Sequence, residues 1–292
     1  MATGITRLFL NTAALACSVL LSGCSGLFFY PDRQVYLTPD RLNLAYRDVY
    51  LKTGDGETLH GWWLPAEARA SQGTVYFLHG NAQNISSHIL NVAWLPDAGY
   101  NVFLIDYRGY GQSTGEPDLE GALHDAETGL RWLANHQLAP EQPLILLGQS
   151  LGGALGIALA SEWSKRNEQP ALAAVVLDAS FTGFRAIARE KLGEFWLTWP
   201  LQVPLSWTIP GEYEGIDLIA GIAPTPVMII HSRSDGIIPF HHGPQLFEAA
   251  EQPKRFLATD TPHAATFVVP EYRRAVTDFL ASGLLQAAQN QR

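Results

Sequence analysis

Short runs of consecutive apolar residues recur along the chain, and segments with apolar residues at three- and four-residue spacing lie between them. A run without polar alternation predicts a strand buried on both faces, whereas the wider spacing predicts an amphipathic helix. The predicted strands are 74–78, 102–105, 144–147, 174–177, 227–230 and 255–257, and the predicted helices are 86–97, 119–136, 151–163, 240–251 and 271–286. This alternation predicts an α/β fold with a doubly wound, mostly parallel sheet.

The segment before these strands has the pattern of a β-hairpin. Apolar residues flank the sequence Thr53-Gly54-Asp55-Gly56, and Asp-Gly is a strong signal for a tight turn. We expect residues 47–64 to form an antiparallel edge of the sheet. Residues 24–46 show no clear period and are predicted to be a linker, or a segment that lies along the domain. The domain itself is expected to occupy residues 47–292.

One long interval, residues 181–224, contains no strand pattern. It is rich in aromatic side chains, and three prolines divide any helix there into short pieces. We interpret it as an insertion that covers the carboxyl ends of the strands as a lid. Trp196, Trp199 and Trp207 are predicted to line an acyl channel or to face lipid. The alternative is that these indoles only fix the lid to the sheet.

The first 23 residues are predicted to be a secretory signal peptide, because Arg7 precedes an apolar stretch that ends in small residues. Leu21-Ser22-Gly23-Cys24 is similar to the lipobox of bacterial lipoproteins. This resemblance implies a lipid anchor on Cys24, and Ser25 favours the outer membrane of a Gram-negative cell. An ordinary cleaved signal, giving a periplasmic or secreted protein, or a retained anchor helix is the alternative. Cleavage would remove Cys17, so no internal disulfide is expected.

The charge balance excludes one class of partner. Lys and Arg total 19 against 28 Asp and Glu, which gives a formal net charge of -9 over 292 residues. A nucleic-acid partner would require a basic face to neutralise phosphates. We therefore expect no nucleic-acid partner.

The strongest chemical signal is Gly148-Gln149-Ser150-Leu151-Gly152, which lies between a predicted strand and a predicted apolar helix. A nucleophilic serine must stand above the sheet on a tight turn, and small residues two positions before and after it prevent a backbone clash. The following helix also directs its first amides at an incoming anion. We predict that Ser150 is a nucleophile.

A serine hydroxyl is a poor nucleophile until a base removes its proton. His263 lies in the loop after the last predicted strand, which can reach the carboxyl edge of the sheet, and is predicted to be this base. Asp235, just after the preceding strand, is predicted to orient the imidazole. Asp178, at the end of the strand before the lid, is the alternative acid, whereas Asp260 is too close to His263 along the chain.

Acyl transfer also requires two backbone amides that converge on the developing oxyanion. The amide of Leu151, directly after the nucleophile, is predicted to be one of them. Asn81, in the loop after strand 74–78, is predicted to supply the other, because Gly80 permits the turn. His79 is predicted to support this loop rather than to take part in the reaction.

Taken together, these motifs resemble the α/β-hydrolase superfamily, and most closely its single-lid, serine aminopeptidase-like branch. The motifs are Leu78-His79-Gly80-Asn81, Asp106-Tyr107-Arg108-Gly109-Tyr110-Gly111-Gln112-Ser113, Gly148-Gln149-Ser150-Leu151-Gly152 and Asp235-Gly236-Ile237-Ile238-Pro239. The resemblance extends over about residues 47–282. It implies the fold, the order of the three catalytic residues and the hydrolysis of an acyl bond, but it does not define the substrate.

Two other motifs are interpreted as structural. Residues 106–113 are expected to form a tight turn in which Arg108 holds the backbone, and the segment fails as a phosphate loop because Thr114 replaces a required glycine. The adjacent pair His241 and His242 could suggest a metal, but neighbours on a helix are expected to point apart. We therefore predict no metal and no cofactor.

The sequence thus predicts a serine hydrolase of carboxylic esters or thioesters in the cell envelope, acting on a small acyl substrate through an acyl-enzyme. A peptidase or amidase, or an acyltransferase, would use the same three residues. A lipoprotein that uses this fold only as a scaffold is the alternative from a different class.

Overall fold

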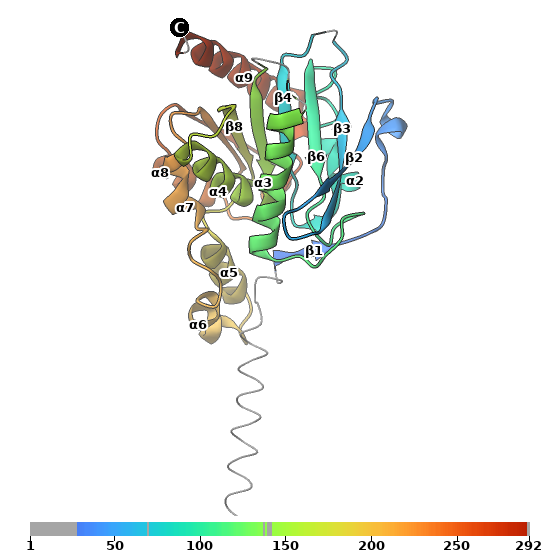
Figure 1. Ribbon diagram of the computed structural model, residues 1–292. Helices are drawn as coiled ribbons and strands as arrows, with labels where there is room; N and C mark the ends of the chain where they lie inside the picture. Colours follow the sequence, from blue (N-terminus) through green and yellow to red (C-terminus); the bar gives the residue numbers. More distant parts are fainter. Residues whose placement is uncertain (1–27, 69, 137, 139–141, 291–292) are drawn as a thin grey trace, which may run out of the picture.

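The computed structural model describes residues 28–68, 70–136, 138 and 142–290, and places an eight-stranded sheet at its centre (Figure 1). The strand order across the sheet is β10-β9-β8-β7-β4-β6-β3-β2. The strands are β2 (Arg47–Lys52), β3 (Thr58–Leu64), β4 (Gly73–Leu78), β6 (Tyr100–Ile105), β7 (Leu144–Gln149), β8 (Leu172–Asp178), β9 (Val227–Ser232) and β10 (Lys254–Thr259). The sheet is parallel from β6 to β10, and the hairpin β2–β3 adds its antiparallel edge. The predicted fold class is confirmed.

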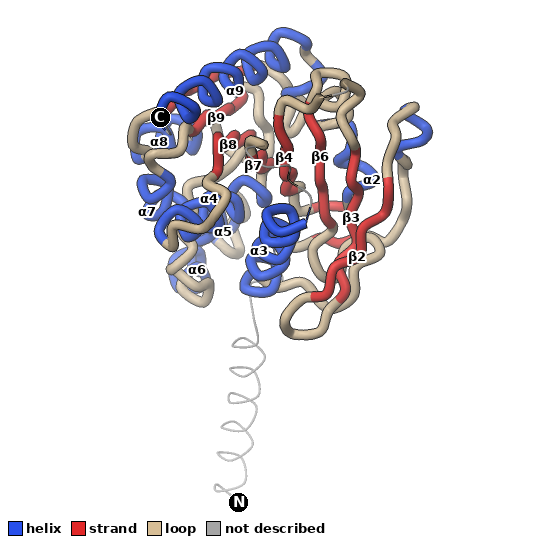
Figure 2. The backbone as a smooth tube through the Cα atoms, turned by 45° about the horizontal axis from the view of Figure 1, so that its top comes forward, coloured by secondary structure: helices blue, strands red, loops and turns tan. Residues whose placement is uncertain are grey.

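Helices cover both faces of the sheet, and the inner strands β4 and β7 are mostly apolar and buried along their whole length (Figure 2). One core cluster contains side chains of α3 (Leu119–His136), α4 (Leu151–Lys165) and α8 (His242–Ala249). The other contains side chains of α2 (Ile85–His88), the 3₁₀ helix η3 (Ile89–Asn91) and α9 (Pro270–Asn290). Among the helices described, none has both the length and the apolar character that a membrane span needs.

The helix predicted over 86–97 is wrong beyond residue 91. Turns replace the helix there. Pro96 prevents a helix from continuing to residue 97, because proline lacks an amide donor and disfavours a helical conformation in the residue before it.

The segment before the hairpin lies along the domain. Its short strand β1 (Tyr30–Pro31) pairs in parallel with β5 (Ala82–Gln83), which follows β4. The 3₁₀ helix η2 (Pro39–Leu42) lies between β1 and β2. This second, two-stranded sheet was not predicted from the sequence, because two residues are too few to show a hydrophobic period.

Arg108 connects the turn after β6 to its surroundings. Its guanidinium lies 2.8 Å from the carboxylate of Asp125 on α3 and 2.9 Å from that of Asp55 in the hairpin turn. Asp125 also accepts the backbone amide of Arg108 at 2.7 Å. The Asp125 side chain is fully buried, and Arg108 with its two acidic partners joins helix, turn and hairpin.

The lid follows β8 and projects beyond the carboxyl end of the sheet (Figure 1). Its elements are α5 (Phe184–Gly193), the 3₁₀ helix η4 (Trp199–Leu201), α6 (Gln202–Ser206), α7 (Gly215–Leu218) and the 3₁₀ helix η5 (Ile219–Ile222). No strand occurs between residues 181 and 224, all of which the structure describes. The elements α7 and η5 pack on α4 of the core, so α5 and α6 form the projecting part of the lid.

Candidate active site

Ser150 stands on the sharp turn between β7 and α4. Its φ of 53° and ψ of -117° lie in a backbone region that residues other than glycine rarely adopt, so the backbone is strained at this residue. A Cβ atom at Gly148 would overlap the carbonyl oxygen of Gly152, and one at Gly152 would overlap that of Leu78. The two glycines are therefore required for a helix to begin directly after the strained serine.

Ser150, His263 and Asp235 form one hydrogen-bonded chain. The hydroxyl Oγ of Ser150 lies 3.2 Å from Nε2 of His263, and Nδ1 of His263 lies 2.7 Å from Oδ2 of Asp235. These side chains come from the ends of three different strands: Ser150 follows β7, Asp235 follows β9 and His263 follows β10. In this hydrogen-bonded arrangement the imidazole can withdraw the serine proton while the carboxylate stabilises the resulting positive charge.

Asp235 is held as an acceptor. The backbone amides of Ile237 and Ile238 donate to its Oδ1 at 2.8 and 2.9 Å, while Oδ2 accepts from His263. Burial opposes ionisation, yet the hydrogen bond and charge of His263 and the two amides lower the pKa of Asp235 below its ordinary value. The carboxylate therefore stays ionised beside the imidazole at neutral pH.

Asp178, the alternative acid, has other partners. Its carboxylate accepts hydrogen bonds from Gln149 Nε2 at 2.9 Å and from Thr266 Oγ1 at 2.7 Å, and its backbone oxygen accepts the amide of Ser150 at 2.8 Å. Burial raises its pKa despite these donors. The structure therefore brings Asp235 to His263, and gives Asp178 contacts that support the serine turn. Asp260 is exposed and lies 3.5 Å from Arg233.

The Asn81 peptide is fixed from both sides. Nδ1 of His79 donates to the carbonyl oxygen of Gly80 at 2.7 Å. Because a trans peptide directs its N–H away from its C=O, this bond sets the direction of the Asn81 amide. The Asn81 carbonyl in turn accepts Tyr110 Oη at 2.7 Å and the Tyr30 amide at 2.9 Å.

His79 is suited to this supporting contact. The ring is completely buried, and burial lowers its pKa well below the ordinary value, so it remains a neutral donor. Leu151, the other predicted oxyanion residue, is the first residue of α4, where amides have no partner within the helix. Both Asn81 and Leu151 line the same cavity as Ser150.

That cavity has a volume of about 610 Å³ and is mostly apolar. Its lining includes the lid side chains Ile187, Ala188, Lys191, Leu192, Leu205 and Ile209, together with Phe28, Tyr30, Phe181 and Ile238. Cavities of this size bind small ligands. Lys191 is the one charged residue in the lining that the structure describes, and its ammonium lies 2.7 Å from Glu194.

The three predicted lid tryptophans do not line this cavity. Trp196, Trp199 and Trp207 are 75%, 60% and 65% exposed, so they lie on the outside of the lid. Sequence reasoning missed the true lining. The apolar spacing of Phe184, Ile187 and Ala188 along α5 was a usable signal, whereas nothing in the sequence pattern pointed to Phe28. Cys24 and the predicted signal peptide lie outside the described residues.

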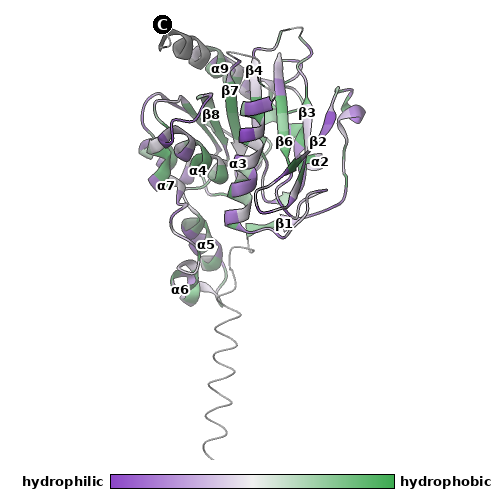
Figure 3. Ribbon diagram, viewed as in Figure 1, coloured by the Kyte–Doolittle hydropathy of each residue, from purple (hydrophilic) through white to green (hydrophobic). Residues whose placement is uncertain are grey.

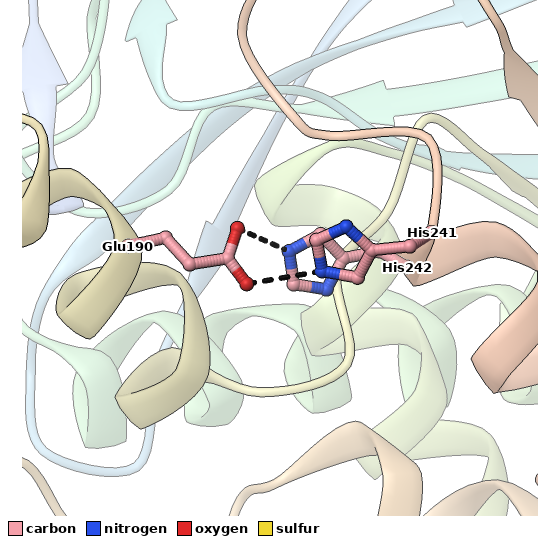
Figure 4. Close-up of side chains that lie close together, drawn as sticks. All are labelled: Glu190, His241 and His242. Atoms are coloured by element: carbon pink, nitrogen blue, oxygen red, sulfur yellow. Dashed lines mark hydrogen bonds and ion pairs between the residues drawn. The ribbon is translucent and has the colours of Figure 1, made fainter.

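His241 and His242 do not point apart, so that expectation is wrong (Figure 4). Their rings stack with centroids 4.4 Å apart, and their Nε2 atoms lie 3.0 and 3.3 Å from the carboxylate of Glu190 on the lid helix. The Thr182 amide donates to Nδ1 of His242 at 3.2 Å, which leaves the proton of the neutral ring on Nε2. The three side chains are therefore better interpreted as hydrogen-bond partners that attach the lid to the core than as ligands of a metal.

The fold and the site together define the class of the protein. A strained serine between a buried strand and a helix, at the carboxyl edge of a doubly wound sheet, is the arrangement of the α/β hydrolases. A sequence model of the family described as serine aminopeptidase, S33, matches residues 69–215. The chain belongs to this family of α/β hydrolases, and the protein is a hydrolase.

Known relatives and structures agree with this assignment. The chain is 32% identical to YfhR of Escherichia coli over 265 residues, which covers 88% of this chain and 87% of that protein. The solved structure of the esterase Pf2001 from Pyrococcus furiosus is similar with a TM-score of 0.68 and 26% identity, over 87% of this chain and 99% of that chain. An α/β hydrolase from Vibrio vulnificus has a TM-score of 0.70 at 20% identity, covering 85% of this chain and 88% of that chain.

Proposed function

We propose that this protein is a serine hydrolase of carboxylic esters or thioesters with an apolar acyl group. The observation that carries the proposal is the bridging position of His263, 3.2 Å from Ser150 and 2.7 Å from Asp235, together with the position of Ser150 in the lining of an apolar cavity. Hydrogen-bond reach between nucleophile, base and orienting acid is the geometric requirement for acyl transfer.

The reaction proceeds in two halves. Oγ of Ser150 attacks the carbonyl carbon while His263 takes its proton, and the amides of Asn81 and Leu151 stabilise the oxyanion. His263 then protonates the departing alkoxide or thiolate, which leaves an acyl group on Ser150. A water molecule, deprotonated by His263, attacks this acyl-enzyme and releases the acid and the free serine.

The lining of the cavity favours an ester substrate over a peptide with a free N-terminus. An aminopeptidase must bind the α-ammonium group of its substrate, for which a carboxylate is the natural partner. The one charged residue in the described lining is Lys191, which has the opposite sign. The likeness to an esterase from Pyrococcus furiosus supports the same choice.

Narrowing the cavity is expected to change the preference for acyl-chain length. Ile187→Trp should reduce kcat/KM for p-nitrophenyl octanoate relative to acetate on the order of 100-fold, because about four methylenes lose burial worth ~0.8 kcal/mol each. Initial rates on both esters, on an acyl-coenzyme A thioester and on an acyl p-nitroanilide measure this preference and the bond that is cleaved.

Leu90→Trp is the matched control, because Leu90 is 57% exposed and does not line the cavity. It should leave the octanoate-to-acetate ratio unchanged. An unaltered ratio in Ile187→Trp would show that the acyl chain binds elsewhere, and faster cleavage of the anilide than of either ester would favour an amidase instead.

We also propose that Cys24 is lipidated and anchors the protein in the cell envelope, on the strength of Leu21-Ser22-Gly23-Cys24. Cells that express the wild-type chain should incorporate labelled palmitate into it, and Cys24→Ala should abolish the label. Cys17→Ala is the control and should retain it. Equal labelling of wild type and Cys24→Ala would rule out this site.

A further inference from the structure

The lid presents an apolar surface to solvent. Seven large side chains, here called the outer lid surface, are each at least 43% exposed: Phe195, Trp196, Leu197, Trp199, Leu201, Val203 and Trp207. Residues 195–211 contain no charged side chain. Figure 3 shows hydrophobic positions on α6, at the tip that projects away from the core.

An exposed group of apolar residues as dense as the outer lid surface indicates that another molecule or a membrane covers it. Single exposed apolar residues are ordinary, but contiguous patches mark surfaces that contact another molecule or a membrane. Three of the seven side chains are indoles, which are favoured at the boundary between lipid and water because one edge is polar and the rest is apolar. The absence of charge indicates insertion among lipids rather than electrostatic attraction.

The start of the described chain lies at this lid. The ring of Phe28 packs edge-on against Phe184 of α5 with centroids 5.4 Å apart, and it shares the cavity lining with Leu205 of α6. Cys24 precedes Phe28 by four residues, which span at most about 14 Å when extended. An anchor at Cys24, or the apolar stretch that precedes it, would therefore hold the lid close to a bilayer.

We propose that the outer lid surface docks on the lipid bilayer, with its indoles at the level of the headgroups. Leu205 and Ile209 line the cavity, while Val203 and Trp207 of the same segment are exposed, so α6 lies between the membrane and the acyl site. The substrate class is then an acyl ester that enters from the membrane. This last point rests on the proposed hydrolysis, whereas the docking itself does not.

Quenching of tryptophan fluorescence by brominated phosphatidylcholine tests the docking. The full chain is reconstituted into vesicles, so that its N-terminal region keeps every variant on the membrane, and the chain contains 8 tryptophans. Brominated vesicles should quench wild-type emission relative to unbrominated vesicles, equally in low and high salt. Trp196→Phe/Trp199→Phe/Trp207→Phe, which keeps the surface apolar, should lose at least two-thirds of this quenching.

A charge-insertion pair tests the surface without removing the reporters. Leu197→Lys/Leu201→Lys should reduce the quenching at least threefold, because both side chains are exposed on the lid. Leu90→Lys, at an exposed apolar position outside the lid, should leave it unchanged.

Three results would overturn the docking. One is wild-type emission that brominated lipid does not quench. Another is a concentration-dependent dimer with blue-shifted emission and no quenching, which would assign the surface to a second copy of the chain. The third is tryptophan emission that is identical in vesicles and in buffer, which would indicate that the N-terminal apolar residues cover the outer lid surface. Ser150→Ala should quench like wild type, so a failure of docking and a failure of the proposed hydrolysis are separate outcomes.

Discussion

Asp235→Asn is expected to lower kcat for p-nitrophenyl acetate by about 10⁴-fold, the cost known for removing the acid from such a triad. The Asp235 carboxylate accepts a hydrogen bond from Nδ1–H of His263 at 2.7 Å and so leaves Nε2 free to receive the proton of Ser150. An asparagine can donate instead, which would place the proton on Nε2 and block that transfer. Steady-state kinetics at neutral pH measures the loss.

Asp178→Asn is the matched control, because it makes the same change in the alternative acid. Asp178 contacts Gln149 and Thr266 rather than His263, so kcat should stay within about 10-fold of wild type. The buried contacts make a lower melting temperature the expected effect of this variant instead. A larger loss of kcat in Asp178→Asn than in Asp235→Asn would assign the acid to the strand before the lid.

The central sheet and the candidate nucleophile could be predicted because their signals are local. A continuous apolar run identifies a strand buried on both faces, and Gly148-Gln149-Ser150-Leu151-Gly152 lies where such a run meets a helix. The positions of Asp235 and His263 follow from the rule that parallel strands end at the same edge. The sequence left Asp178 as an alternative to Asp235, since both carboxylates follow strands at that edge.

The lid could be located from the sequence but not oriented. In its segment 195–207 the polar residues Thr198, Gln202 and Ser206 recur at four-residue spacing on the more covered side, while the large apolar side chains are mostly exposed. This is the reverse of the usual amphipathic pattern, so the spacing does not show which apolar side chains face the cavity. The tryptophans lie outside, and Leu205 and Ile209 lie inside, for reasons of tertiary packing. Phe28 could not be found either, because its partner Phe184 is distant in sequence and no local pattern connects the two.

The pair His241 and His242 shows a different limit. A helical period predicts the directions of Cα–Cβ bonds, but the side chains extend beyond these and turn towards whatever partner lies near. Here the partner is the carboxylate of Glu190, which belongs to the lid and is brought close only by the fold. A contact that depends on two segments far apart in the chain leaves no trace in the spacing of either one.

The second expected result concerns the nucleophile itself. Ser150→Ala should lower kcat for p-nitrophenyl esters by about 10⁵-fold or more, because the residual rate then depends only on binding and the oxyanion amides. His263→Ala should cost nearly as much, since the two side chains act as one unit. Thermal melting of both variants separates this loss from unfolding.

Covalent labelling of Ser150 is the most direct test of the account. A fluorophosphonate should react with the folded wild-type protein at one equivalent, and mass spectrometry of the peptides should place the adduct on Ser150. Ser150→Ala should remain unlabelled, and His263→Ala should label at least 100-fold more slowly because its serine lacks a base. An adduct on another residue, or none on folded protein that hydrolyses esters, would contradict the claim that Ser150 is the nucleophile.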